Sequence, residues 1–92
     1  MKFEWDEVKN RSNIRKHGFD FADAPEVFRG PLLAHPDTRE DYGEERWIAI
    51  GLLKHRVVVL AFAQQAEDVM RIISLRKADR DEREGFEKAL QD

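Results

Sequence analysis

The sequence predicts an α+β fold in which an antiparallel sheet of hairpin-linked strands is flanked by N-terminal helices and one C-terminal helix. Helix end signals mark the first and last segments, apolar residues alternate in the segments between them, and only short connections separate these strands. The 92 residues are expected to form one domain, residues 1–92, because a chain of this length builds a single hydrophobic core.

Residues 7–17 are predicted to form a helix because both ends carry the appropriate signals. Asp6 is a suitable N-cap, the basic residues 15–17 suit the negative C-terminal end, and Gly18 can take the left-handed conformation that closes a helix. The apolar stripe of this helix is thin, so we expect it to cover an edge of the sheet. The segment before it, Phe3–Trp5, is predicted to be a short edge strand or an irregular segment that leads into the helix.

Residues 21–28 indicate a second, short helix with Asp20 or Asp23 as its cap. Pro25 lies inside this segment, and proline removes a backbone N–H and disfavours helix at the residue before it. We therefore expect the helix to start late or to be distorted there, and to end at Gly30-Pro31.

Four strands are expected to follow. They are Leu32–His35, Arg46–Leu53, Arg56–Ala63 and Val69–Lys77. Lys54-His55 is predicted to be a two-residue hairpin turn, and Gln64–Asp68 the next loop. The third strand is almost continuous Val, Leu and Phe, which is typical of a central strand covered on both faces, or on one face with a shallow groove on the other.

The last strand and the C-terminal helix meet at a junction rich in cations. Alternation along the strand predicts that Arg76 shares a face with Ser74 while Arg71 lies on the opposite face with Leu75. Residues 79–90 are then expected to form a helix, with an aspartate at its start that can cap it.

The composition excludes several classes of protein. Without cysteine the chain has no disulfide scaffold, no thiolate zinc site and no cysteine nucleophile. The longest apolar run, Val57 to Ala63, is far short of a membrane span, and early acidic residues do not resemble a signal segment, so we expect a cytoplasmic protein without a membrane partner. The three histidines are far apart in the sequence and no phosphate-binding glycine loop occurs, so we expect no metal and no cofactor.

Cations gather locally in a chain whose net charge is −3, a value that excludes a generic polycation. Residues 9–17 hold Lys9, Arg11, Arg15, Lys16 and His17 without an acid, and residues 71–80 hold Arg71, Arg76, Lys77 and Arg80. Such segregation can present a basic face to RNA, although a solvated helix face and surface ion pairs explain many such residues. Arg76 is harder to explain in that way, because it leaves an apolar strand at a strand-to-helix junction.

Three stretches resemble the BrnT-type toxins of bacterial toxin–antitoxin pairs. The first stretch comprises Trp5–Lys9 and Asn13–Gly18. The second is Gly43–Arg46 followed by Ile48–Gly51, and the third is Arg71–Ala78 followed by Glu82-Arg83. The resemblance implies a RelE-like fold, an α+β scaffold of microbial ribonucleases. It also implies a cognate antitoxin, a small ribbon-helix-helix protein that blocks the toxin and whose complex binds operator DNA to repress the shared operon.

The resemblance further implies metal-free cleavage of an RNA substrate by attack of the ribose 2′-OH on the adjacent phosphate, which would arrest growth. Arginine suits the phosphate because its planar fork binds two oxygens, while histidine or a held glutamate can move the protons. The catalytic candidates are Arg76, Arg46, Glu44, Glu45, His17 and Lys54. Candidates for RNA binding, through backbone contacts that do not read sequence, are Lys9, Lys16, Arg71, Lys77 and Arg80.

The chain departs from the family pattern at three places. Ala63-Gln64-Gln65 stands where BrnT-like chains usually carry Thr followed by Glu-Arg, Phe86 stands where Tyr is common, and Pro25 replaces a helix-friendly residue. The first two changes remove polar groups that could belong to the site. Two other interpretations therefore stay open: a weakened toxin that acts only as an antitoxin-bound co-repressor, and a generic RNA- or DNA-binding domain.

Overall fold

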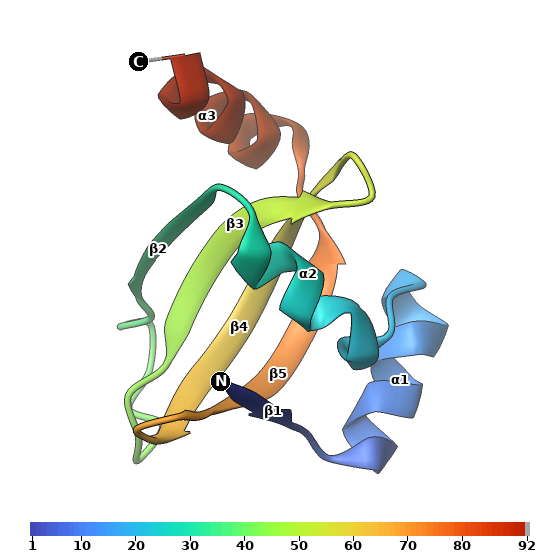
Figure 1. The fold of residues 1–92 in the computed structure, drawn as a ribbon, viewed down its shortest axis with the longest axis vertical. Helices are drawn as coiled ribbons and strands as arrows, with labels where there is room; N and C mark the ends of the chain where they lie inside the picture. Colours follow the sequence, from blue (N-terminus) through green and yellow to red (C-terminus); the bar gives the residue numbers. More distant parts are fainter. Residues whose placement is uncertain (92) are drawn as a thin grey trace.

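The computed structural model describes residues 1–91, which fold around one five-stranded sheet (Figure 1). The elements are β1 (Lys2–Glu4), α1 (Glu7–His17), the 3-10 helix η1 (Phe21–Asp23), α2 (Ala24–Arg29), β2 (Leu32–Pro36), β3 (Trp47–Leu53), β4 (Arg56–Ala66), β5 (Val69–Lys77) and α3 (Arg80–Gln91). The strand order is β1-β5-β4-β3-β2. Strands β2 to β5 pair antiparallel, whereas β1 pairs parallel to β5. The α+β fold class is confirmed. The segment before α1 is the edge strand that was one of its two expected forms, and its parallel pairing with β5 is a departure from the expected antiparallel sheet.

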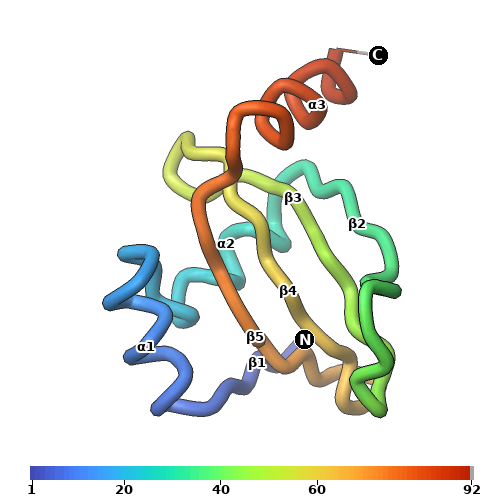
Figure 2. The backbone as a smooth tube through the Cα atoms, turned by 180° about the vertical axis from the view of Figure 1, so that it is seen from behind, coloured from blue at the N-terminus to red at the C-terminus, as the bar shows by residue number. Residues whose placement is uncertain are grey.

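The two faces of this sheet are covered unequally (Figures 1 and 2). On the helix face, which carries Val58 and Leu60 of β4, η1 and α2 close a core in which Phe21 is fully buried. On the open face, which carries Val59 of β4, α3 contributes Phe86 to a smaller cluster at one end. The central strand β4 thus has one covered face and one partly open face. Of the two arrangements expected for it, this is the one with a shallow groove on one face.

Helix α1 packs along the edge of β5, as its thin apolar stripe predicts. β1 ends at Glu4, opposite Arg71, and leaves the rest of the β5 edge without a partner strand. Buried Asn13 replaces that partner: its Nδ2 donates to the carbonyl oxygen of Leu75 at 2.8 Å, and the Leu75 N–H donates to its Oδ1 at 3.2 Å. The side chain of Asn13 therefore satisfies backbone groups that would otherwise be buried without hydrogen bonds.

The local signals at turns and helix ends are confirmed. Asp6 accepts a hydrogen bond from the N–H of Lys9, and Gly18 closes α1 in the left-handed region at φ 76°. Lys54 and His55 form the two-residue turn between β3 and β4, with φ angles of 49° and 70°. Pro25 is the second residue of α2, where its missing N–H costs little, so the helix does start late.

Two expectations about β4 and β5 are wrong. Strand β4 continues to Ala66, and only Glu67 and Asp68 form the turn, because the exposed residues Gln64, Gln65 and Ala66 extend the ladder beyond the apolar core. The ladder also shifts register between Ala61 and Phe62, so that β5 contains a β-bulge.

The bulge changes the face on which Arg71 lies. Arg76 pairs with Val59 and Arg71 pairs with Ala63, and both partners belong to the open face because alternate residues of β4 share a face. Arg71 and Arg76 therefore lie on the same face, whereas strict alternation predicts opposite faces. None of the helices within residues 1–91 is long and apolar enough to span a membrane.

Candidate active site

A groove of about 510 Å³ lies on the open face, where α3 leaves the sheet uncovered. Small and branched side chains of β3 and β4, among them Ile48 and Ala61, form its floor. Its polar lining comes from α1, β2, the loop after β2, β5 and α3, and consists of His17, His35, Asp37, Thr38, Arg39, Ser74, Arg76 and Glu82. The groove thus combines imidazoles, which can move protons, with cations that can hold an anion.

Arg76 is fixed at one end of this groove by the first turn of α3. Its Nη1 and Nη2 donate to Glu82 Oε1 and Oε2 at 2.8 and 2.9 Å, and Nη1 also donates to the carbonyl oxygen of Lys77 at 3.2 Å. Glu82 is itself held by a capping box, because the Asp79 N–H donates to Oε1 and the Glu82 N–H donates to Asp79 Oδ1, both at 2.8 Å. The capping signal in the sequence therefore orients Glu82, and Glu82 orients the arginine.

The guanidinium of Arg76 keeps one edge for other ligands. Arginine has five N–H donors, and the contacts above use both hydrogens of Nη1 and one of Nη2. The N–H of Nε and the second N–H of Nη2 form no hydrogen bond with residues 1–91. These two donors point along one edge of the planar group, the geometry that binds two oxygens of a carboxylate or a phosphate.

The ion pair shifts the titration of both partners. The hydrogen bonds from Arg76 lower the pKa of Glu82 from 4.5 to about 2, against the opposing effect of desolvation. The same hydrogen bonds raise the pKa of Arg76, while the like charge of Arg39 acts to lower it. Glu82 is therefore a permanent anion at neutral pH, and Arg39 is close enough for its charge to act on Arg76.

The fold brings together two histidines that are far apart in the sequence. His17 is the last residue of α1 and lines the groove near Ser74, whereas His35 belongs to β2 at the other side of the sheet. The Nδ1 atom of His35 lies 3.1 Å from the carbonyl oxygen of Pro36. A proton on Nδ1 would be donated to that oxygen and would leave Nε2 as the free proton acceptor. Sequence reasoning missed His35, although its position at the end of an edge strand was a usable signal.

Glu44 lies outside the groove and joins two arginines of the open face. Its Oε1 forms ion pairs with Arg71 and, at 3.5 Å, with the Nε of Arg46, and Oε2 accepts a hydrogen bond from Gln65 at 3.3 Å. The guanidinium of Arg46 also stacks over the ring of Tyr42 at 4.1 Å. As expected, an arginine holds Glu44 in place. The Glu44 carboxylate in turn fixes the positions of Arg46 and Arg71.

Cations connect this cluster to the groove. His17 and Ser74 line both the groove and an adjoining hollow of about 220 Å³ that is bordered by Lys9 and Lys16. Lys9 in turn borders a small hollow with the two arginines of the Glu44 cluster. We call this series the basic track; it consists of Arg76, His17, Lys16, Lys9, Arg71 and Arg46.

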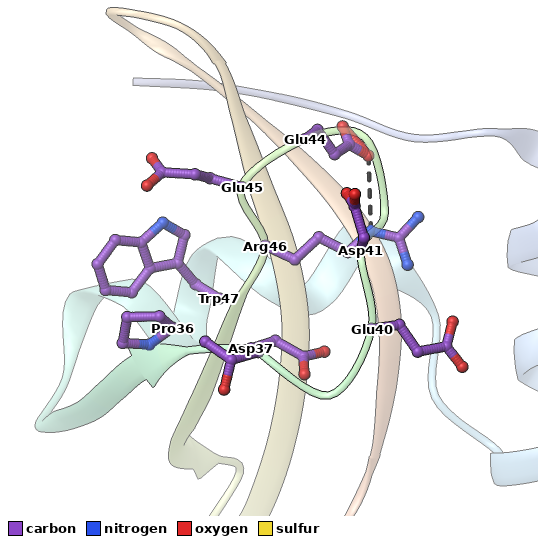
Figure 3. Close-up of a pocket in the computed structure, with 9 residues that line it drawn as sticks. Pro36, Asp37, Glu40, Asp41, Glu44, Glu45, Arg46 and Trp47 are labelled. Carbon is purple, nitrogen blue, oxygen red and sulfur yellow. Dashed lines mark ion pairs between the residues drawn. The ribbon is translucent and has the colours of Figure 1, made fainter.

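The loop between β2 and β3 surrounds a different, acidic hollow of about 380 Å³. Figure 3 shows the carboxylates of Glu40, Asp41, Glu44 and Glu45 around it, with Glu44 paired to Arg46. Such a hollow repels phosphate, so Glu45 lies outside the basic track. Within residues 1–91 no three His, Asp or Glu side chains are arranged to hold a metal ion.

Three of the expected cations also lie apart from the track. Lys54 belongs to the β3–β4 turn, where its backbone N–H donates to Glu26 of α2 at 2.7 Å, and Lys77 pairs with Val58 on the helix face. Arg80 is 81% exposed on α3 and pairs with Glu84. Proximity in sequence to Arg76 placed Lys77 and Arg80 among the candidates, but strand alternation and the start of α3 direct them elsewhere.

Comparisons with known proteins agree with this architecture. A family model described as "Ribonuclease toxin, BrnT, of type II toxin-antitoxin system" matches residues 5–82. The crystal structure of the Brucella abortus ribonuclease toxin BrnT matches with a TM-score of 0.68 and 33% sequence identity, over 87% of this chain and 99% of that one. None of the curated proteins compared with the chain matches it. The family model and the solved structure both extend over most of the sequence, and the chain belongs to the BrnT family of ribonuclease toxins of type II toxin–antitoxin systems.

Proposed function

We propose that this protein is a metal-independent endoribonuclease toxin that cleaves RNA in the open-face groove and arrests growth until its antitoxin binds. The observation that supports this most is the grouping of Arg76 with His17 and His35 in one groove. A phosphate-binding cation beside two imidazoles can supply the base, the acid and the charge stabilisation for metal-free RNA cleavage.

In the proposed reaction one imidazole removes the proton from the ribose 2′-OH, and the 2′-oxygen forms a bond to the adjacent phosphorus. The bond from phosphorus to the 5′-oxygen breaks, and the second imidazole gives a proton to that leaving oxygen. The products are a 2′,3′-cyclic phosphate and a 5′-hydroxyl. Arg76 would hold the non-bridging oxygens through its Nε and Nη2 donors, where negative charge develops in the transition state.

Glu82 acts in this proposal as a positioning residue. Glu82 also lines the groove, and both of its carboxylate oxygens accept hydrogen bonds from the other edge of the Arg76 guanidinium. The rest of the basic track, from Lys16 and Lys9 to Arg71 and Arg46, would bind the RNA backbone on one side of the cleavage site without reading the bases. Lys54, Lys77 and Arg80 are left out of this surface.

The test is cleavage of labelled RNA in the presence of EDTA, comparing Arg76→Ala with Arg80→Ala as an exposed control. We expect Arg76→Ala to lower the rate by about 10²–10³ with its melting temperature within a few degrees of wild type, and Arg80→Ala to cleave normally. Arg76→Lys should recover little, because an ammonium cannot hold two oxygens at once. In cells, the same loss should abolish growth arrest. RNA that stays intact with folded wild-type protein would contradict the proposal.

A co-repressor without activity is the second candidate, and one contact favours it. Gln65, at the position of a departure from the family pattern, binds Glu44 and helps to hold that anion beside Arg46 and Arg71. Both candidates share a cognate antitoxin, which we propose to be a ribbon-helix-helix protein whose complex with this chain binds operator DNA in the cytoplasm. Intact RNA together with normal operator binding by the complex would favour the co-repressor.

A further inference from the structure

We propose that Arg39 is a second phosphate-binding residue of the groove, held in position by the carboxylate of Asp37. Arg39 lies on the loop after β2 and lines the same groove as Arg76. The identity of the ligand as an RNA phosphodiester rests on the proposed function, whereas the binding of phosphate by this pair of arginines can be tested separately.

Asp37 is built into the base of the loop. Its side chain is only 2% exposed, and its backbone N–H donates to the carbonyl oxygen of Arg46 at 2.7 Å, next to the start of β3. The carboxylate accepts hydrogen bonds from the Nε and Nη2 of Arg39, both at 2.8 Å, and from the Arg39 backbone N–H at 3.2 Å. These hydrogen bonds lower the pKa of Asp37 well below its usual range, so it remains an anion at any working pH.

Arg39 itself faces outward. Its side chain is 73% exposed although its partner is buried, so the ion pair has one fixed side and one open side. Asp37 uses the Nε and Nη2 donors of Arg39. The hydroxyl of Tyr42 is close enough to Arg39 to help raise its pKa, and the Nη1 group donates no hydrogen bond to another carboxylate or to a backbone carbonyl within the described part of the chain. The free edge is therefore the end of the guanidinium, which can bind two oxygens of an anion.

Arg39 and Arg76 share this design. Each guanidinium is held by a carboxylate on one edge, Asp37 or Glu82, and each retains donors on another edge. Two like charges on one groove repel each other, and the charge of Arg39 does act on the pKa of Arg76, whose rise is caused mainly by Glu82. A multivalent oxyanion between them removes that repulsion, and a phosphodiester presents the oxygens that both free edges can bind.

A purely structural role for Arg39 is the alternative, in which the ion pair only holds the loop. The experiment that separates the two roles is binding of a short 2′-O-methyl oligoribonucleotide, which keeps the phosphates but lacks the attacking hydroxyl. Affinity is measured from low to moderate salt for wild type, Arg39→Ala, Arg39→Lys and Asp37→Asn. Arg83→Ala, an arginine of α3 paired with Glu87, is the matched control.

We expect Arg39→Ala to weaken binding about 10- to 100-fold and to flatten the log–log salt dependence by about 0.7, while Arg83→Ala changes neither. Asp37→Asn should weaken binding with little change in the salt slope, because Arg39 keeps its charge but loses its fixed orientation. Arg39→Lys keeps a cation over Asp37 and so protects the fold, and it should still bind less tightly than wild type because it lacks the planar fork.

The proposal would be overturned if Arg39→Ala bound the oligoribonucleotide with the affinity and salt slope of the wild type. If the alanine variant does not fold, wild-type affinity in Arg39→Lys would overturn it. So would a wild-type protein that does not bind the oligoribonucleotide at all. Tight, Arg39-dependent binding by a protein that leaves ordinary RNA intact would instead contradict only the proposed cleavage.

Discussion

The helix face and the open face belong to the same strands, yet they are closed in different ways. On the helix face η1 and α2 pack so tightly that a Cβ at Gly51 would lie 2.8 Å from Val27 Cγ1. On the open face α3 reaches the sheet mainly through Phe86, and the remaining surface holds a groove of about 510 Å³. Apolar contacts fix the first face, whereas carboxylates fix the arginines of the second.

This difference shows how a small domain can combine a core and a site on one sheet. Because side chains alternate along β4, the same segment supplies a core to one side and the floor of a groove to the other. Substitutions on the helix face should therefore change the free energy of unfolding, and those on the open face should change activity or binding.

Removing the buried ring of Phe21 should destabilise the protein most. We expect Phe21→Ala to lower the free energy of unfolding by about 3–5 kcal/mol, because it leaves a cavity in the closed core. Leu33→Ala is the control on the open-face side, since Leu33 is 41% exposed and its loss should cost less than about 1 kcal/mol. Denaturant unfolding measures both values, and equal losses would show that the two faces do not differ.

Two glycine substitutions should have opposite signs. Gly51→Ala should cost about 1–3 kcal/mol, because its Cβ meets Val27, Leu32 and the carbonyl oxygen of Pro31 within 3.3 Å. A Cβ at Gly85 in α3 meets nothing within 4 Å among residues 1–91, so Gly85→Ala should stabilise the protein by up to about 1 kcal/mol through helix propensity. Melting curves of both variants provide the check, and a stabilised Gly51→Ala would disprove tight packing under α2.

Acid should weaken the anchor of α3 on Arg76. The pKa of Glu82 is about 2 in the folded protein and near 4.5 when unfolded, so its stabilising effect is complete above pH 4.5 and is lost as the pH falls toward 2. Solvent screens this partly exposed ion pair, so we expect it to contribute about 1 kcal/mol to the free energy of unfolding. The difference in unfolding free energy between wild type and Glu82→Gln, measured from pH 5 to 2, should shrink with acid; a constant difference would contradict the assignment.

The smallest effect should come from single cations of the basic track. Replacing Lys16 by Ala should flatten the log–log salt dependence of RNA affinity by up to about 0.7 and leave sequence preference unchanged. Lys77→Ala is the matched control, because Lys77 pairs with Val58 on the helix face. Equal changes in the two variants would mean that RNA contacts both faces.

Local signals in the sequence were sufficient for the elements themselves. Asp6 and Gly18 define the ends of α1, Pro25 delays α2, and Lys54-His55 forms the hairpin turn as predicted. Each of these depends on the geometry of a few neighbouring residues, which the sequence specifies directly. The family resemblance was likewise present in the sequence and was confirmed by the family match over residues 5–82.

The arrangement of the candidate site depended on tertiary structure. A bulge in β5 puts Arg71 on the face of Arg76, and strand order brings His35 of β2 to the same groove as His17 of α1. Periodicity alone could not reveal either, since a one-residue shift in the ladder reverses every face and strand order is set by packing between distant segments. The sequence alone determined which elements form and which family they belong to; the pairing of those elements decided which charges meet.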